Sequence, residues 1–164
     1  MARLIQAGQF VGRGEERTAA VLERELPDTW TVICNKELVN PDGSSVEVDF
    51  IIVGKHAVYV VEEKSWQGPI HGNSNGWVLA SGESHKSPLD KAAFVARRVA
   101  GLLRGNVPRL KDTVGDAHFV FPRVILSSDD VQIYVQDTRV AIQVLKLSQA
   151  AERLRQADEQ QAGP

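Results

Sequence analysis

Cysteine is almost absent from the 164-residue sequence, which contains only Cys34. One cysteine excludes an internal disulfide and a zinc site built on cysteine thiolates. Long apolar runs are also missing, because the longest fall far short of the roughly 20 residues that cross a bilayer. The N-terminal stretch MARLIQAGQFVGRGEERT lacks the apolar core of a signal peptide. We therefore expect a cytoplasmic protein with no membrane association.

An excess of charge of one sign is missing as well. The 19 basic and 21 acidic residues leave a formal net charge of -2. This balance argues against a general polyanion binder, although a local basic patch can still bind phosphate groups. Hydrophobic residues make up 43% of the chain and charged residues 24%, as is typical of one globular domain with its own core.

The spacing of apolar residues predicts a series of helices and strands. The expected helices span residues 15–26, 88–104 and 148–157. The expected strands span residues 30–34, 46–53, 57–64, 77–80, 117–126, 131–134 and 140–144. A tight turn at Gly54 joins two of them as an antiparallel hairpin, and Pro122 indicates an edge or a bulge in its strand. The pattern predicts a mixed α/β fold with a sheet flanked by helices.

Charged residues interrupt two apolar strands of the predicted hairpin. Asp49 lies within VEVDFIIV, and Glu62, Glu63 and Lys64 end AVYVVEEK. A buried carboxylate is costly unless it is paired, protonated or bound to a cation. On adjacent strands Asp49 and Glu62 converge within reach of one ion, and their oxygens suit Mg²⁺ or Mn²⁺. The alternative is a structural salt bridge for Asp49 and a solvated strand end for the other residues.

Positive charge gathers in the second predicted helix and just beyond it. Residues 91–111 contain six basic residues and no acid. One interpretation is a phosphate-facing surface, and the alternative is the solvated face of an amphipathic helix. We expect DNA contacts from four of these residues: Lys91, Arg97, Arg98 and Arg104.

A longer pattern joins these features. The pair Gly14-Glu15 opens the first helix, VDFIIV forms a strand, and VVEEKSWQG forms the next strand and its exit. This string resembles the nuclease-related domain (NERD), a branch of the PD-(D/E)xK nuclease superfamily, over about residues 10–126. The resemblance implies a restriction-endonuclease-like core with the order helix, three strands, helix, strands.

The resemblance also implies roles for the charged residues. Asp49 and Glu62 are expected to bind the metal, with the backbone carbonyl of Glu63 in the inner coordination sphere. Lys64 corresponds to the catalytic lysine. Glu15 corresponds to a glutamate that positions metal or water. Glu16 stays open as its alternative, because adjacent helical residues point about 100° apart and only one faces the site.

One position departs from the family pattern. The family usually carries a glutamine shortly after the proline that opens the second helix, whereas this sequence reads SPLDK at residues 87–91. Two consequences stay open: Lys91 contacts a phosphate in place of the glutamine, or the site is weakened.

Two functional hypotheses follow from the residues and the resemblance. The first is a metal-dependent DNA endonuclease in phage defence or DNA processing. The second is a non-catalytic DNA-binding or regulatory module, because domains of this family occur fused to protein kinases or helicases. We expect an N-terminal arm over residues 1–12, a nuclease-like domain over 13–147, and a C-terminal helix and polar tail over 148–164 that lead to a downstream domain. A homodimer is left open.

Overall fold

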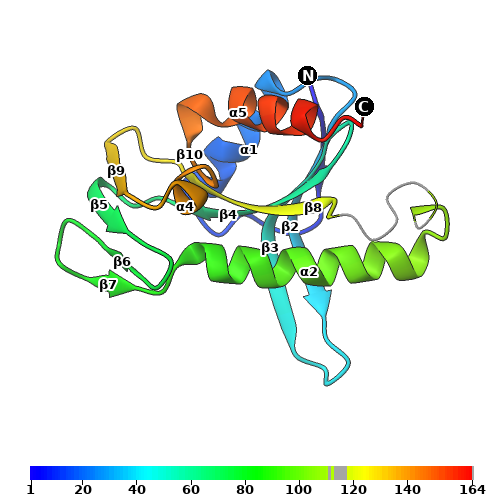
Figure 1. Cartoon of the computed structure of the whole chain (residues 1–164), viewed down its shortest axis with the longest axis horizontal. Coiled ribbons are helices and arrows are strands. Elements are labelled where there is room, and N and C mark those ends of the chain that lie inside the picture. The colour runs from blue at the N-terminus through cyan, green and yellow to red at the C-terminus, as the bar shows by residue number, and fades with distance from the viewer. Residues whose placement is uncertain (111, 113–117, 164) are drawn as a thin grey trace.

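A six-stranded mixed sheet forms the centre of the molecule (Figure 1). The computed structural model describes residues 1–110, 112 and 118–163. The strand order is β1-β2-β3-β4-β8-β10, with antiparallel pairing from β2 to β4 and parallel pairing elsewhere. The strands span Arg3–Gln6 (β1), Thr31–Val39 (β2), Ser45–Val53 (β3), Val58–Lys64 (β4), Val120–Leu126 (β8) and Val144–Lys146 (β10).

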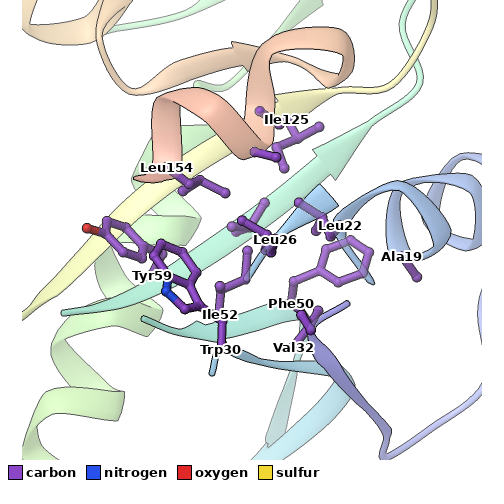
Figure 2. Close-up of a cluster of buried hydrophobic side chains, with 14 of the residues drawn as sticks. Ala19, Leu22, Leu26, Trp30, Val32, Phe50, Ile52, Tyr59, Ile125 and Leu154 are labelled. Carbon is purple, nitrogen blue, oxygen red and sulfur yellow. The ribbon is translucent and has the colours of Figure 1, made fainter. Parts of the chain in front are cut away.

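Helices cover both faces of this sheet. Helices α1 (Arg13–Glu25) and α5 (Leu147–Gln160) lie on one face, and α2 (Pro88–Asn106) lies on the other (Figure 1). Figure 2 shows the core beneath α1 and α5, where Leu22 and Leu154 meet Phe50 and Ile52 of β3. A separate buried cluster lies between α2 and the opposite face of the sheet. The arrangement confirms the predicted fold class, a mixed sheet flanked by helices.

The predicted helices and the predicted hairpin are confirmed. Strands β3 and β4 pair antiparallel on either side of Gly54. Helix α2 begins at Pro88, and the Ser87 hydroxyl accepts a hydrogen bond from the Leu89 N–H at 3.3 Å. Serine as the N-cap with proline at the first helical position sets this boundary locally. Among the described helices, none is long and apolar enough to cross a membrane.

Pro122 lies in β8 at a place where one side of the strand has no partner. The Val124 N–H donates to the Gln143 carbonyl at 2.9 Å, on the β10 side of the strand. Strand β10 pairs only with residues 124–126 of β8. The nitrogen of Pro122, two residues earlier, points to the same side but beyond the end of β10. The predicted edge position therefore holds for this half of β8.

A second, smaller sheet has the order β7-β6-β5-β9. Its strands span Gly68–Gly72 (β5), Trp77–Val78 (β6), Ser84–His85 (β7) and Val131–Val135 (β9). No strand is predicted from the sequence over residues 68–72, where β5 lies. The strand forms because β9, about 60 residues away in the sequence, pairs with it in parallel. Gly72 is required here, since a Cβ at this position would lie 2.8 Å from the ring of Trp77.

Three other segments differ from the sequence-based expectation. The strand predicted over residues 140–144 is wrong in its first part, which belongs to helix α4 (Thr138–Ala141). This helix starts because the Asp137 carboxylate accepts the Arg139 N–H at 2.9 Å. Strand β1 lies in the segment predicted as an arm, and β2 extends five residues past the predicted end at residue 34. Residue 117, the predicted start of β8, lies outside the described residues.

Asp158 joins helix α5 to the turn between β3 and β4. Its carboxylate is 2% exposed and accepts hydrogen bonds at 3.0–3.2 Å from the backbone N–H groups of Lys55, His56 and Ala57. A Cβ on Gly54 would lie 2.5 Å from one of its oxygens. Helix α5 is thus anchored to the same core as the sheet.

Candidate active site

Buried carboxylates from α1, β3 and β4 lie close together. Glu15 is 9% exposed, Asp49 8% and Glu62 6%. The burial of Glu62 excludes the alternative in which it belongs to a solvated strand end. Each of these carboxylates therefore needs a compensating donor, proton or cation.

Asp49 and Glu62 lie on neighbouring strands, as the hairpin predicts. Phe50 and Val61 are the paired positions directly beside them. The Asp49 carboxylate accepts the backbone N–H of Glu63 at 2.8 Å. Burial, followed by the negative charge of Glu62, raises the pKa of Asp49 to about 7. Asp49 therefore changes its charge near neutral pH.

Two lysines compensate the charge of Glu62. The Lys91 ammonium lies 3.2 Å from one carboxylate oxygen of Glu62 and 3.1 Å from the other. Lys64 lies 3.6 Å from the first oxygen, and its ammonium is 5.7 Å from the centre of the Trp66 ring. Lys91, expected to contact a phosphate, is thus placed within the acidic site by the first turn of α2.

The Glu63 side chain points away from this group, as strand alternation requires. Its carboxylate accepts a hydrogen bond from the Ser127 hydroxyl. Burial raises the pKa of Glu63 above its ordinary range. A Cβ on Gly14 would lie 2.5 Å from a Glu63 side-chain oxygen, so this carboxylate lies directly against the start of α1. Because the Glu63 side chain points away, only its backbone carbonyl is left as the metal ligand that the family resemblance implies.

The structure distinguishes Glu15 from Glu16. The Glu15 carboxylate accepts the Val11 N–H at 3.0 Å and the Asn35 side-chain amide at 2.8 Å. Glu16, about 100° further around α1, is exposed to solvent. Glu15 is therefore the glutamate of the pair that lies with the other acids.

Glu47 and Asn35 also lie in this site, although neither was predicted from the sequence. One carboxylate oxygen each from Glu47, Glu15 and Asp49 lies within 4.8 Å of the other two. The Asn35 amide also donates to Glu47 at 3.2 Å. The separation of Glu47 from Asp49 by two positions on one strand was a usable signal, because such residues share a face. No pattern in the sequence marks Asn35.

The basic residues of α2 do not share one face. At about 100° per residue, Lys91 and Arg98 lie along one flank of the helix and Arg97 and Arg104 along another. Arg98 donates to the Asn40 side chain at the tip of the β2–β3 hairpin, and Arg104 lies 5.2 Å from the centre of the Phe119 ring. A DNA surface that uses all four residues together remains a prediction.

Replacement of Asp49 by asparagine tests the raised pKa. A folded-state pKa of about 7, against a usual value of 3.8, means that the folded wild type holds a proton that the unfolded chain has released. Wild-type stability is therefore lost as pH rises between these values, while Asp49→Asn lacks this loss. The stability advantage of the variant should grow by about 3 kcal/mol from pH 5 to pH 8.

Urea denaturation in the presence of a chelator measures this difference. Asp129→Asn provides the control, because the Asp129 side chain is 80% exposed. Equal pH dependence for the wild type and Asp49→Asn would contradict the raised pKa.

A comparison with known families identifies the family of the chain. The sequence model described as the nuclease-related domain, NERD, matches residues 12–127. The matched residues include α1, the hairpin strands β3 and β4, α2 and β8. Neither the curated proteins nor the solved structures contain a match. Because the matched region covers more than half of the chain and contains Glu15, Asp49, Glu62 and Lys64, the chain belongs to the nuclease-related domain family.

Proposed function

We propose that this chain is a divalent-metal-dependent endonuclease that hydrolyses phosphodiester bonds of DNA, in phage defence or DNA processing. The observation that carries the proposal is the pair of buried carboxylates, Asp49 and Glu62, on adjacent strands beside Lys64. Membership of a nuclease-related family supports a nucleic-acid substrate.

The oxygen atoms around Asp49 fit Mg²⁺ or Mn²⁺. Both ions prefer carboxylates, backbone carbonyls and water, and the two buried carboxylates offer hard, negatively charged ligands. In the proposal, Asp49, Glu62 and the Glu63 carbonyl hold the ion. The ion would polarise a phosphoryl oxygen and lower the pKa of water.

In the proposal, Lys64 acts on the bound phosphate and the attacking water, and Glu15 provides a fixed hydrogen-bond acceptor. The Lys64 side chain is 35% exposed, so its ammonium is accessible to a bound phosphate as well as to Glu62. A cation there orients the attacking water and stabilises negative charge that develops on the phosphate. Glu15, held by the Val11 N–H and the Asn35 amide, is a fixed acceptor on the α1 side.

A cleavage assay with Glu62→Gln tests this function. The wild-type chain should cut plasmid and linear DNA when Mg²⁺ or Mn²⁺ is present. The variant keeps the size of the side chain but loses its charge, and we expect cleavage to fall by about 100-fold or more. Glu16→Gln, which changes an exposed neighbour of Glu15, should cleave normally. Absence of wild-type cleavage with both ions, or equal cleavage by Glu62→Gln, would contradict the proposal.

A second candidate function is a DNA-binding or regulatory module without catalysis, within a larger kinase or helicase. The observation that favours it is that Lys91 contacts both Glu62 oxygens from the first turn of α2, where the family's usual glutamine, near Asp90 or Lys91, is missing. Such a module should bind DNA equally well with Mg²⁺ and with a chelator, and fluorescence anisotropy measures this. Metal-independent binding without cleavage supports the module, and metal-dependent cleavage rejects it.

A further inference from the structure

We propose that a cavity between β8 and the C-terminal half of α5 binds the phosphoryl group of a small anionic ligand. The cavity has a volume of about 270 Å³. Two arginines, one from each element, line it: Arg123 of β8 and Arg153 of α5. The other lining residues are two glutamines and three apolar residues: Gln156, Gln160, Ile142, Leu145 and Ala157.

The two arginines have no acidic partner. Within the residues that the structure describes, neither Arg123 nor Arg153 forms an ion pair. Both side chains are partly withdrawn from solvent. Burial lowers the pKa of Arg123, and the positive charge of Arg153 lowers it as well. Two like charges that are partly removed from water repel each other, so an anion bound between them would offset this repulsion.

Contacts within the protein use only part of the hydrogen-bonding capacity of the two guanidinium groups. Arg153 donates to the backbone carbonyls of Val144 at 3.0 Å and Ile142 at 3.1 Å. Arg123 donates to the preceding backbone carbonyl at 2.8 Å, and its guanidinium lies 5.5 Å from the centre of the Tyr59 ring. A guanidinium carries several N–H donors, so both groups keep donors for an oxyanion. The existing contacts hold the two groups in place, which reduces the entropy lost on binding.

Helix α5 adds neutral donors beside the two charges. Arg153, Gln156 and Gln160 are three and then four positions apart, so their side chains share one side of the helix. Both glutamines are exposed, so their amide groups are accessible at the rim of the cavity. An amide N–H group is a good donor to a phosphate oxygen.

A phosphoryl group suits this donor set. Guanidinium groups match the oxygens of phosphate in pairs, and a phosphate monoester carries a charge of up to about −2 at neutral pH. That charge balances both arginines, whereas a single carboxylate would compensate only one of them. The volume of the cavity is near the lower limit of small-molecule pockets, roughly 300 Å³. The ligand is therefore inorganic phosphate or the terminal phosphate of a mononucleotide.

The cavity is separate from the acidic site. Arg123 pairs with Val61 of β4, and Val61 belongs to the core beneath α1 and α5. The next residue of β4, Glu62, points to the opposite face, where Lys91 of α2 contacts it. Helices α5 and α2 cover opposite faces of the sheet (Figure 1). The inference thus goes beyond the proposed nuclease and does not depend on it.

Calorimetric titration of the whole chain with inorganic phosphate, in the presence of a chelator and at constant ionic strength, tests the proposal. We expect one binding site in the wild type. Arg123→Met removes a guanidinium but keeps an unbranched side chain beside Tyr59, and Gln160→Glu adds a negative charge at the exposed rim. Each variant should weaken phosphate binding by at least about tenfold, the size expected when a hydrogen bond to a charged group is lost. Circular dichroism checks that both variants fold.

Two further variants are matched controls. Arg155→Gln removes an exposed arginine that lies about 200° around α5 from Arg153. Gln132→Glu adds the same negative charge as Gln160→Glu, but on an exposed position of β9. Both controls should bind phosphate as the wild type does. Unchanged affinity in both Arg123→Met and Gln160→Glu would overturn the proposal, as would the absence of phosphate binding by the wild type at millimolar concentration.

Titration with deoxyadenosine monophosphate distinguishes the two sources of the phosphoryl group. Tighter binding of the nucleotide than of phosphate would assign the cavity to a mononucleotide, and equal or weaker binding would assign it to free phosphate. A short DNA duplex without terminal phosphates should not displace bound phosphate, and displacement by it would overturn the assignment to a small ligand. Because the chelator is present throughout, a chain that never cuts DNA can still pass this test.

Discussion

Replacement of Lys64 by alanine is expected to reduce DNA cleavage by about 10²- to 10³-fold. The Lys64 ammonium lies 3.6 Å from Glu62 and is about one-third exposed, so it is placed to act on a phosphate bound at the carboxylates. The loss should fall on the chemical step, because charge that stabilises the transition state more than the bound substrate changes the rate constant. Single-turnover cleavage at saturating DNA concentration measures that rate constant.

The fold should survive this replacement. Glu62 keeps its contact with Lys91, and the partly exposed Lys64 side chain leaves no sealed cavity. The matched control is Lys55→Ala, an exposed lysine at the opposite end of the β3–β4 hairpin. Equal rate constants for the wild type and Lys64→Ala would remove Lys64 from the catalytic group.

Replacement of Asp158 by alanine should cost about 3 kcal/mol or more of unfolding free energy. The variant leaves three buried or partly buried backbone N–H groups, those of Lys55, His56 and Ala57, without their acceptor. Each unsatisfied buried donor costs about 1–3 kcal/mol. Tyr59, whose hydroxyl lies 3.5 Å from Asp158, loses a contact as well. Urea denaturation followed by circular dichroism measures the change.

Glu159→Ala is the matched control for Asp158→Ala. It removes an acid from the next position of α5, where the side chain is exposed, and should change stability by less than about 0.5 kcal/mol. A destabilisation of the same small size in Asp158→Ala would show that the carboxylate does not anchor α5 to the hairpin turn. The test also addresses the predicted boundary after residue 147, because it measures how strongly α5 supports the core.

Much of the core could be predicted because its signals are local. The boundary of α2 follows from Ser87 and Pro88, and the β3–β4 hairpin follows from apolar runs on both sides of Gly54. The pairing of these strands then places Asp49 beside Glu62. These elements form where short-range backbone preference and apolar period agree.

Other elements depend on partners that are distant in the sequence. Strand β1 pairs with β2, which begins 25 residues after β1 ends, and β5 pairs with β9. Their residues have no strong β period of their own, so the pairing decides their structure. Residues 140–141 show the opposite error, a strand predicted where the structure has a helix. Their apolar run is typical of a strand, but the Asp137 N-cap starts a helical turn there.

By itself, the sequence determined the fold class, the β3–β4 hairpin with Asp49 and Glu62, and the family. The reason is that helix and strand periods, turn residues and the D…ExK spacing are local features of the sequence. Only the tertiary structure decided which charges meet. It selected Glu15 over Glu16, placed Lys91 on Glu62, and brought Asn35 and Glu47 to the same acids. The physical reason is that such contacts depend on strand register and on the rotation of α1 and α2 about their own axes, which the packing of the whole core sets.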